Sequence, residues 1–165
     1  MYATMPKDPT ERRDLIRLFA PIFNTPGLTV VSHELKRDKV MLACEGIDIT
    51  GPCFDTQLAH YLVDTDARHT LPEIANSYIG YETHDYKTEP RLRKPYTIQD
   101  PESAMTHSCE YAATTLKIKD PLHDKLCEME MLQLYYDIEL PMTFARFNGN
   151  GRNESRSQGT KTSFT

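Results

Sequence analysis

The stretch Leu28-Thr-Val-Val-Ser-His-Glu-Leu-Lys-Arg-Asp38 places a short apolar run directly before a charged run with helical character. Leu28 to Val31 follows the Pro26-Gly27 turn and is rich in β-branched residues, which is typical of a buried strand in a sheet covered by helices. From about Glu34 to Glu45 apolar residues mix with charged ones, and Gly46 supplies the left-handed residue that commonly ends a helix. Strand and helix are therefore joined by almost no loop.

The same order of strand and helix returns further along the chain. Ile47–Ile49 and Cys53-Phe54 are predicted strand pieces, and Asp55 and Thr56 are expected to cap the helix that follows. The run Thr70-Leu-Pro-Glu73 is a capping box with proline in the first turn, so it predicts another helix that ends at the next glycine. The alternation predicts an α/β fold with a mixed sheet flanked by helices.

The C-terminal half has a different pattern. Residues 81–107 carry prolines and charges with little periodicity and predict an irregular connection. Helical pattern returns at residues 108–118, and Asp120-Pro121 is a start signal for a long helix from Leu122 to about Leu140 with apolar residues on most faces. Residues 148–165 have almost no apolar side chains and predict a disordered tail.

Length and local signals together suggest three parts. We expect one domain over residues 1–120, a helical segment over 121–147 and the tail over 148–165. Within the domain, residues 1–8 predict the end of a strand, and Thr10 is expected to cap the first helix.

Composition limits the classes of function. The chain has 19 Lys and Arg against 24 Asp and Glu, a formal charge of −5, so binding to nucleic acid would need a local basic patch or metal ions. Its four cysteines form no C-x-x-C pair, which indicates reduced structural thiols. Neither a signal peptide nor an apolar run of membrane-spanning length is present, so we expect a soluble cytoplasmic protein with no membrane partner.

Several spaced motifs resemble a single protein family. They are Val31-Ser-His-Glu-Leu-Lys-Arg-Asp38, Gly46-Ile47, Phe54-Asp-Thr-Gln-Leu58, Arg68-His69, Ile79-Gly-Tyr81 and Glu110-Tyr-Ala-Ala113. In this order they resemble the 3′-5′ proofreading exonuclease domain of family-A bacterial DNA polymerases, whose fold is ribonuclease H-like. The resemblance covers about Met1 to Leu140 and ends in a segment similar to the link into the polymerase domain. It implies a truncated domain whose first strands would precede Met1.

The resemblance implies a metal-dependent reaction on DNA. The family hydrolyses the single-stranded 3′ end with two Mg²⁺ or Mn²⁺ ions about 3.5 to 4 Å apart, held by four carboxylates beside a tyrosine that orients water. Asp38 matches one metal-binding aspartate, and Tyr111 matches the tyrosine. The Asp-x-Glu pair of the first motif has no counterpart here, and the aspartate that follows the tyrosine is missing after Ala113. Asp38 and Tyr111 are therefore expected to be vestigial, with no metal cofactor retained.

Four further residues match family positions that contact DNA. His33, Glu34 and Arg37 stand where the family has Gln, Asn and Tyr, positions that help to hold the frayed primer end, and Arg68 matches a residue that contacts single-stranded DNA. Glu34 would bring negative charge near phosphates, so binding is expected to be weak.

Three hypotheses follow. The first is an inactive fragment of a DNA polymerase I-type exonuclease domain, related to DNA replication and repair, that binds single-stranded 3′ ends weakly. The second is a non-catalytic docking module, for a polymerase domain or another protein, that uses the apolar helix 122–140. The third is a live nuclease that recruits Glu34 or Asp55 beside Asp38.

Overall fold

The structure, a computed structural model, describes residues 8–84 and 101–143. The strand predicted at residues 1–8 and the tail predicted at 148–165 lie outside these residues, apart from Asp8, as does most of the predicted irregular connection.

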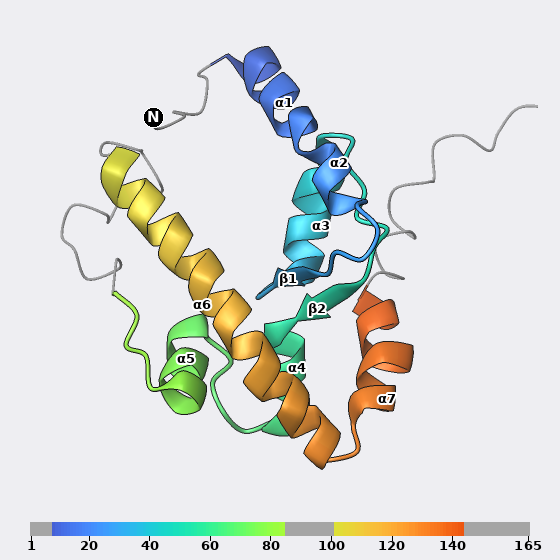
Figure 1. The fold of residues 1–165 in the computed structure, drawn as a ribbon, viewed down its shortest axis with the longest axis vertical. Coiled ribbons are helices and arrows are strands. Elements are labelled where there is room, and N and C mark those ends of the chain that lie inside the picture. Colours follow the sequence, from blue (N-terminus) through green and yellow to red (C-terminus); the bar gives the residue numbers. More distant parts are fainter. Residues whose placement is uncertain (1–7, 85–100, 144–165) are drawn as a thin grey trace, which may run out of the picture.

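Helices outnumber strands in the described chain (Figure 1). The elements are α1 (Pro9–Leu18), α2 (Ala20–Phe23), β1 (Val30–Ser32), α3 (Leu35–Cys44), β2 (Cys53–Asp55), α4 (Thr56–Val63), α5 (Leu71–Ile79), α6 (Pro101–Glu128), α7 (Leu132–Leu134) and the π-helical turn η2 (Tyr135–Glu139). The two strands are parallel, with Val30 opposite Cys53 and Ser32 opposite Asp55. The predicted α/β class is confirmed in this coarse form.

The core lies between α6, the two strands and the last helical segment. Figure 1 shows α6 along one side of the strands, α4 and α5 against its second half, and α7 on the opposite side of the strands. The first half of α6 projects beyond the sheet, and its first buried residue among those described is Thr114. The largest fully buried apolar side chains are those of Phe54, Leu35, Ile74, Ile118, Leu122, Leu126 and Tyr135. Burial of this apolar set is the main favourable contribution to folding.

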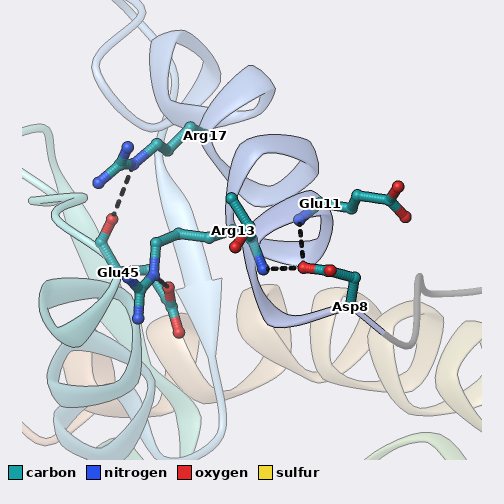
Figure 2. A network of polar contacts seen from close by, with 6 residues as sticks. Asp8, Glu11, Arg13, Arg17 and Glu45 are labelled. Atoms are coloured by element: carbon teal, nitrogen blue, oxygen red, sulfur yellow. Dashed lines mark hydrogen bonds and ion pairs between the residues drawn. The ribbon is translucent and has the colours of Figure 1, made fainter.

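The first helix begins two residues earlier than the sequence indicated. Asp8 is the N-cap of α1, and its Oδ1 accepts from the backbone nitrogens of Thr10 at 2.6 Å and Glu11 at 3.4 Å (Figure 2). The predicted cap at Thr10 is therefore wrong. Pro9 occupies the first helical position, where the missing N–H costs nothing, so the cap belongs to the residue before it.

Two arginines connect α1 to the end of α3. Arg13 Nε pairs with Glu45 Oε2 at 2.9 Å, and Arg17 Nε donates to the Glu45 carbonyl at 3.5 Å (Figure 2). Arg17 lies in the last turn of α1, so charged side chains from two successive turns of this helix contact Glu45 at the end of α3.

Other local predictions are confirmed or corrected. Gly46 and Gly80 have φ values of 80° and 61°, as their predicted roles at helix ends require. Asp55 is the N-cap of α4, as predicted. Ile47 and Ile49 are buried but lie in no strand, so the strand piece predicted there is wrong.

The helix predicted from Leu122 to Leu140 is two separate segments. Residues 122–128 belong to α6, which already begins at Pro101 and contains Pro121 in its interior, and α7 and η2 form the second segment. Asp120-Pro121 predicted the start of a helix because proline is favoured in the first turn of a helix. The helix continues through Pro121, and both Ile118 before it and Leu122 after it are fully buried.

A sharp C-terminal motif ends α6. Glu130 has a φ of 56°, its N–H bonds to the Cys127 carbonyl at 3.0 Å, and the Met131 N–H bonds to the Leu126 carbonyl at 2.8 Å. This pair of bonds is the Schellman pattern, here with glutamate where glycine is usual. The chain therefore turns back toward the sheet and starts α7.

Two further observations concern the whole described region. No helix in residues 8–84 and 101–143 is long and apolar enough to cross a membrane. All four cysteines are free, and Cys53 alone among them is buried.

Candidate nucleic-acid site

Polar side chains gather where β1 and β2 end. β1 ends at Ser32 and β2 at Asp55, and α3 and α4 begin within three residues of these points. Because the strands are parallel, their carboxyl ends meet at the same edge of the sheet. In open α/β sheets the crevice outside this edge is where ligands bind.

Asp55 is the buried acid of this edge. Its Oδ2 accepts from the Leu35 N–H at 3.0 Å, and its Oδ1 accepts from the N–H groups of Gln57 at 2.9 Å and Leu58 at 3.2 Å. Burial raises the pKa of Asp55 to about 6 against the lowering effect of these three bonds, and the charge of Asp38 raises it further. Asp55 therefore ties the start of α3 to the start of α4.

Asp38 lies beside it, in the first turn of α3. The Ser32 hydroxyl donates to Asp38 Oδ2 at 2.5 Å, and the same hydroxyl oxygen accepts from the Glu34 N–H at 3.2 Å. Asp38 is half-buried. One of its carboxylate oxygens is therefore held by the end of β1.

Tyr111 reaches the same edge from α6. Its side chain is 36% exposed, and its ring meets the edge of the His33 ring with centroids 6.3 Å apart. Burial raises the pKa of Tyr111 to about 12, and the neighbouring charges of Glu34 and Asp38 act in the same direction. The structure thus brings Asp38 and Tyr111, distant in the sequence, to one site.

His33 lies inside the protein at this site. The side chain is buried, and its Nδ1 is 3.0 Å from Thr56 Oγ1, whose hydroxyl lies 3.3 Å from the Ser32 carbonyl. Burial lowers the pKa of His33, although a hydrogen bond with the backbone of His69 opposes this. The ring packs between β1, α4 and α6 and is not presented to solvent.

The remaining predicted DNA contacts are at the surface. Arg37 forms an ion pair with Glu34 one turn before it on α3. Arg68, in the segment between α4 and α5, is 85% exposed in its side chain and lies 3.4 Å from Glu73 Oε1. Both guanidinium groups are accessible to phosphate, and each already has a carboxylate neighbour.

A cleft of about 720 Å³ opens between α3 and α4 beside this edge. Glu34, Arg37 and Asp55 border it, whereas Asp38 and Tyr111 do not. Its walls are mainly apolar, and the other side chains that line it include Val40, Met41, Gln57, Leu58, Tyr61 and His69.

Apart from Glu34, Arg37 and Asp55, the residues that line the cleft were not predicted from the sequence to form a site. The available signal was helical spacing, because Arg37, Val40 and Met41 share one face of α3. Gln57 and Tyr61 are likewise four apart on α4. That spacing is also what a core-facing helix shows, so it marks the cleft only when the two helices are placed together.

The sequence matches the family model described as 3′-5′ exonuclease over residues 3–129. The chain belongs to the 3′-5′ exonuclease family. It is similar to DNA polymerase I of two Streptococcus pneumoniae strains, TIGR4 and R6, with 28% identity over 137 residues that cover 82% of this chain and 15% of the relative. DNA polymerase I of Borreliella burgdorferi is 26% identical over 131 residues, covering 79% of this chain and 14% of the relative. The chain thus spans a small part of these curated relatives. No solved structure gives a significant match.

The carboxylates that the structure describes at this edge, Asp38 and Asp55, do not fit a two-metal centre. Two divalent ions need several carboxylate oxygens free to coordinate them. Here the Ser32 hydroxyl holds one oxygen of Asp38, and three backbone N–H groups hold both oxygens of Asp55. Within the two described ranges, no group of three or more His, Cys, Asp or Glu side chains could hold a metal ion.

Proposed function

We propose that this chain is a ribonuclease H-like exonuclease-type domain that binds the single-stranded 3′ end of DNA weakly and does not hydrolyse it. Membership of the 3′-5′ exonuclease family and similarity to DNA polymerase I support DNA as the ligand. The position of Asp38 and Tyr111 at the carboxyl ends of the strands supports this edge as the place where DNA would bind.

The observation that carries the absence of hydrolysis is the engagement of Asp55. Asp38 alone cannot hold two ions, so an active site would need a second carboxylate near it. Asp55 is the buried acid among the described residues, but its oxygens cap α4 and hold the start of α3. Turning Asp55 toward a metal would leave buried N–H groups without acceptors, at about 1 to 3 kcal/mol each.

Charge around the edge supports weak binding. Arg37 and Arg68 are the two arginines among the predicted DNA contacts, and each has an acidic neighbour that would compete with phosphate. Two phosphate contacts on a single strand would give a slope of about −1.4 for the logarithm of affinity against the logarithm of salt concentration.

Binding is tested by the fluorescence anisotropy of a labelled single-stranded oligonucleotide with the full chain. Glu34→Gln should strengthen binding several-fold, on the order of 1 kcal/mol or less, because it removes a repulsive charge and frees Arg37. Arg37→Ala and Arg68→Ala should weaken binding and lower the salt slope. Arg13→Ala, on α1 and paired with Glu45, is the matched control and should change neither. If the wild-type chain shows no salt-sensitive binding, the proposal fails.

A docking role is the second candidate, and it is favoured by apolar side chains that stay exposed between residues 136 and 142. In the segment 122–140, Leu122, Leu126, Tyr135 and Leu140 are buried in the chain's own core, so much of the surface expected for docking is already used. Tyr136, Ile138 and Met142 remain exposed nearby. Docking would be supported if the wild-type chain binds no oligonucleotide but binds a purified polymerase domain, and if Ile138→Ser abolishes that binding.

A further inference from the structure

Two histidine rings face each other where α4 meets the segment that leads to α5. His60 Nδ1 lies 2.8 Å from His69 Nδ1, and the ring centroids are 5.1 Å apart at an interplanar angle of 69°. His60 is on α4 and is buried, whereas His69 is half-buried in residues 64–70. The contact is a direct hydrogen bond between two imidazole rings.

A bond between two Nδ1 atoms holds only one proton. In the neutral pair one Nδ1 donates and the other accepts, and this arrangement also survives when a single further proton binds at an outer nitrogen. When both rings are protonated, both Nδ1 atoms carry hydrogen and both rings are positive. The bond is then lost and becomes a repulsion between two like charges at short range.

The His69 side chain and backbone together hold residues 64–70 to the rest of the site. The His69 carbonyl accepts from Gln57 Nε2 at 3.4 Å, and its backbone also bonds with the His33 ring. His69 lines the cleft between α3 and α4, and Arg68 precedes it. Movement of this segment would therefore change the cleft and the position of Arg68 together.

The groups around the pair come from every element packed against it. His33 approaches from the end of β1, and the rings of Tyr78 on α5 and Tyr61 on α4 stand edge-on to His60 and His69 respectively. Asp64 and Glu73 favour the charged form of His60, and Lys125 on α6 acts on Tyr78. Burial and the neighbouring His69 outweigh the two acids, so the pKa of His60 is lowered.

We propose that the His60–His69 pair is a pH-operated latch that holds residues 64–70 against α4 at neutral pH and releases them in mildly acidic conditions. Because the pKa of His60 is lowered in the closed state, the released state binds more protons. The latch is therefore fully closed above the ordinary histidine pKa of about 6.5 and weakens as pH falls below it. Its opening would move the His69 side of the cleft together with Arg68, and would loosen the bonds that the His69 backbone makes with Gln57 and with the His33 ring.

Amide hydrogen exchange of the full chain tests the latch. Protection factors, corrected for the intrinsic rate, are measured for residues 64–70 at about pH 7.5 and about pH 5, which bracket the histidine pKa. Protection should fall several-fold on acidification, because the released segment binds protons more readily than the closed pair, in which the pKa of His60 is lowered. In His69→Phe, which keeps a ring beside Tyr61 but has no Nδ1, protection should be low at both values and change less than twofold. Equal pH dependence in wild type and His69→Phe overturns the latch.

Two controls keep the outcome specific. Asp55 titrates in the same range, but it is retained in His69→Phe, so any remaining pH dependence there measures Asp55. His123→Gln removes a histidine on α6 outside the pair and should leave the wild-type response intact.

Should His69→Phe not fold, the side-chain ¹⁵N chemical shifts of His60 and His69 in the wild type at about pH 7.5 test the latch. One protonated and one unprotonated Nδ1 support the latch, and two unprotonated Nδ1 atoms overturn it.

Discussion

The phenolic oxygen of Tyr135 lies 2.6 Å from the backbone nitrogen of Asp55 and 3.2 Å from its carbonyl oxygen. It accepts from the N–H and donates to the carbonyl, so one hydroxyl satisfies both outward-facing backbone groups of the last residue of β2. The Tyr135 ring also packs on Phe54 with centroids 5.2 Å apart. The C-terminal helical segment is therefore part of the fold that carries the site, because it closes the outer edge of β2.

Removing the Tyr135 hydroxyl tests this closure. Tyr135→Phe should lower the free energy of unfolding by about 1 to 3 kcal/mol, because the buried Asp55 N–H loses its acceptor while the ring remains. Tyr136→Phe is the matched control, since Tyr136 is 40% exposed and should change stability by less than about 0.5 kcal/mol. Urea unfolding followed by circular dichroism gives both values. Equal effects of the two substitutions would show that the hydroxyl does not close the strand edge.

The raised pKa of Asp55 predicts a pH dependence of stability. Its folded value of about 6 lies above the ordinary value of 3.8, so the folded chain binds more protons between the two. The free energy of unfolding contributed by Asp55 is therefore greatest below about pH 4 and falls as pH rises to about 6, by up to about 3 kcal/mol.

The measurement is a difference between variants, because the histidines and other acids also titrate. Urea unfolding of wild type and Asp55→Asn is compared from about pH 4 to about pH 7. The free energy of unfolding of the wild type should fall relative to that of Asp55→Asn by up to about 3 kcal/mol. Asp48→Asn removes an exposed acid from the same segment and should give a flat difference. A flat difference for Asp55→Asn as well would mean that its pKa is not raised.

Two neighbouring apolar residues on α6 predict opposite outcomes. Ile118 is fully buried, whereas Leu116 is 61% exposed on the other face of the helix. Ile118→Ala should cost about 2 to 5 kcal/mol through lost burial and the cavity it leaves. Leu116→Ala should cost less than about 0.5 kcal/mol. Thermal and urea unfolding measure both, and a large loss for Leu116→Ala would mean that the face of α6 is assigned wrongly.

Signals confined to a few consecutive residues predicted local structure well. Asp55 before Thr56-Gln57 predicted the cap of α4, and the glycines at 46 and 80 predicted the ends of α3 and α5, because each depends on backbone geometry within one turn. The order of motifs likewise predicted the family. These features need no knowledge of which segments meet in space.

Features that depend on competition or on tertiary contact were missed. Asp8 and Thr10 are both good caps, and Pro9 decides between them. The end of α6 uses Glu130 in the left-handed region, where sequence rules expect glycine or asparagine, so the break in the helix had no signal. The His60–His69 pair is nine residues apart and forms only when residues 64–70 fold back on α4.

The proposed absence of DNA hydrolysis at this exonuclease-family site is tested by release of nucleotides from a 5′-labelled single-stranded oligonucleotide with Mg²⁺ or Mn²⁺. Wild type, Asp38→Ala and Asp55→Asn are compared with a metal-free reaction on a denaturing gel. We expect the wild type to shorten the oligonucleotide no more than Asp38→Ala does in the presence of metal, even with the full chain in excess over the oligonucleotide. Shortening by the wild type that needs metal and disappears in Asp38→Ala would contradict it, and its further loss in Asp55→Asn would identify Asp55 as the second carboxylate.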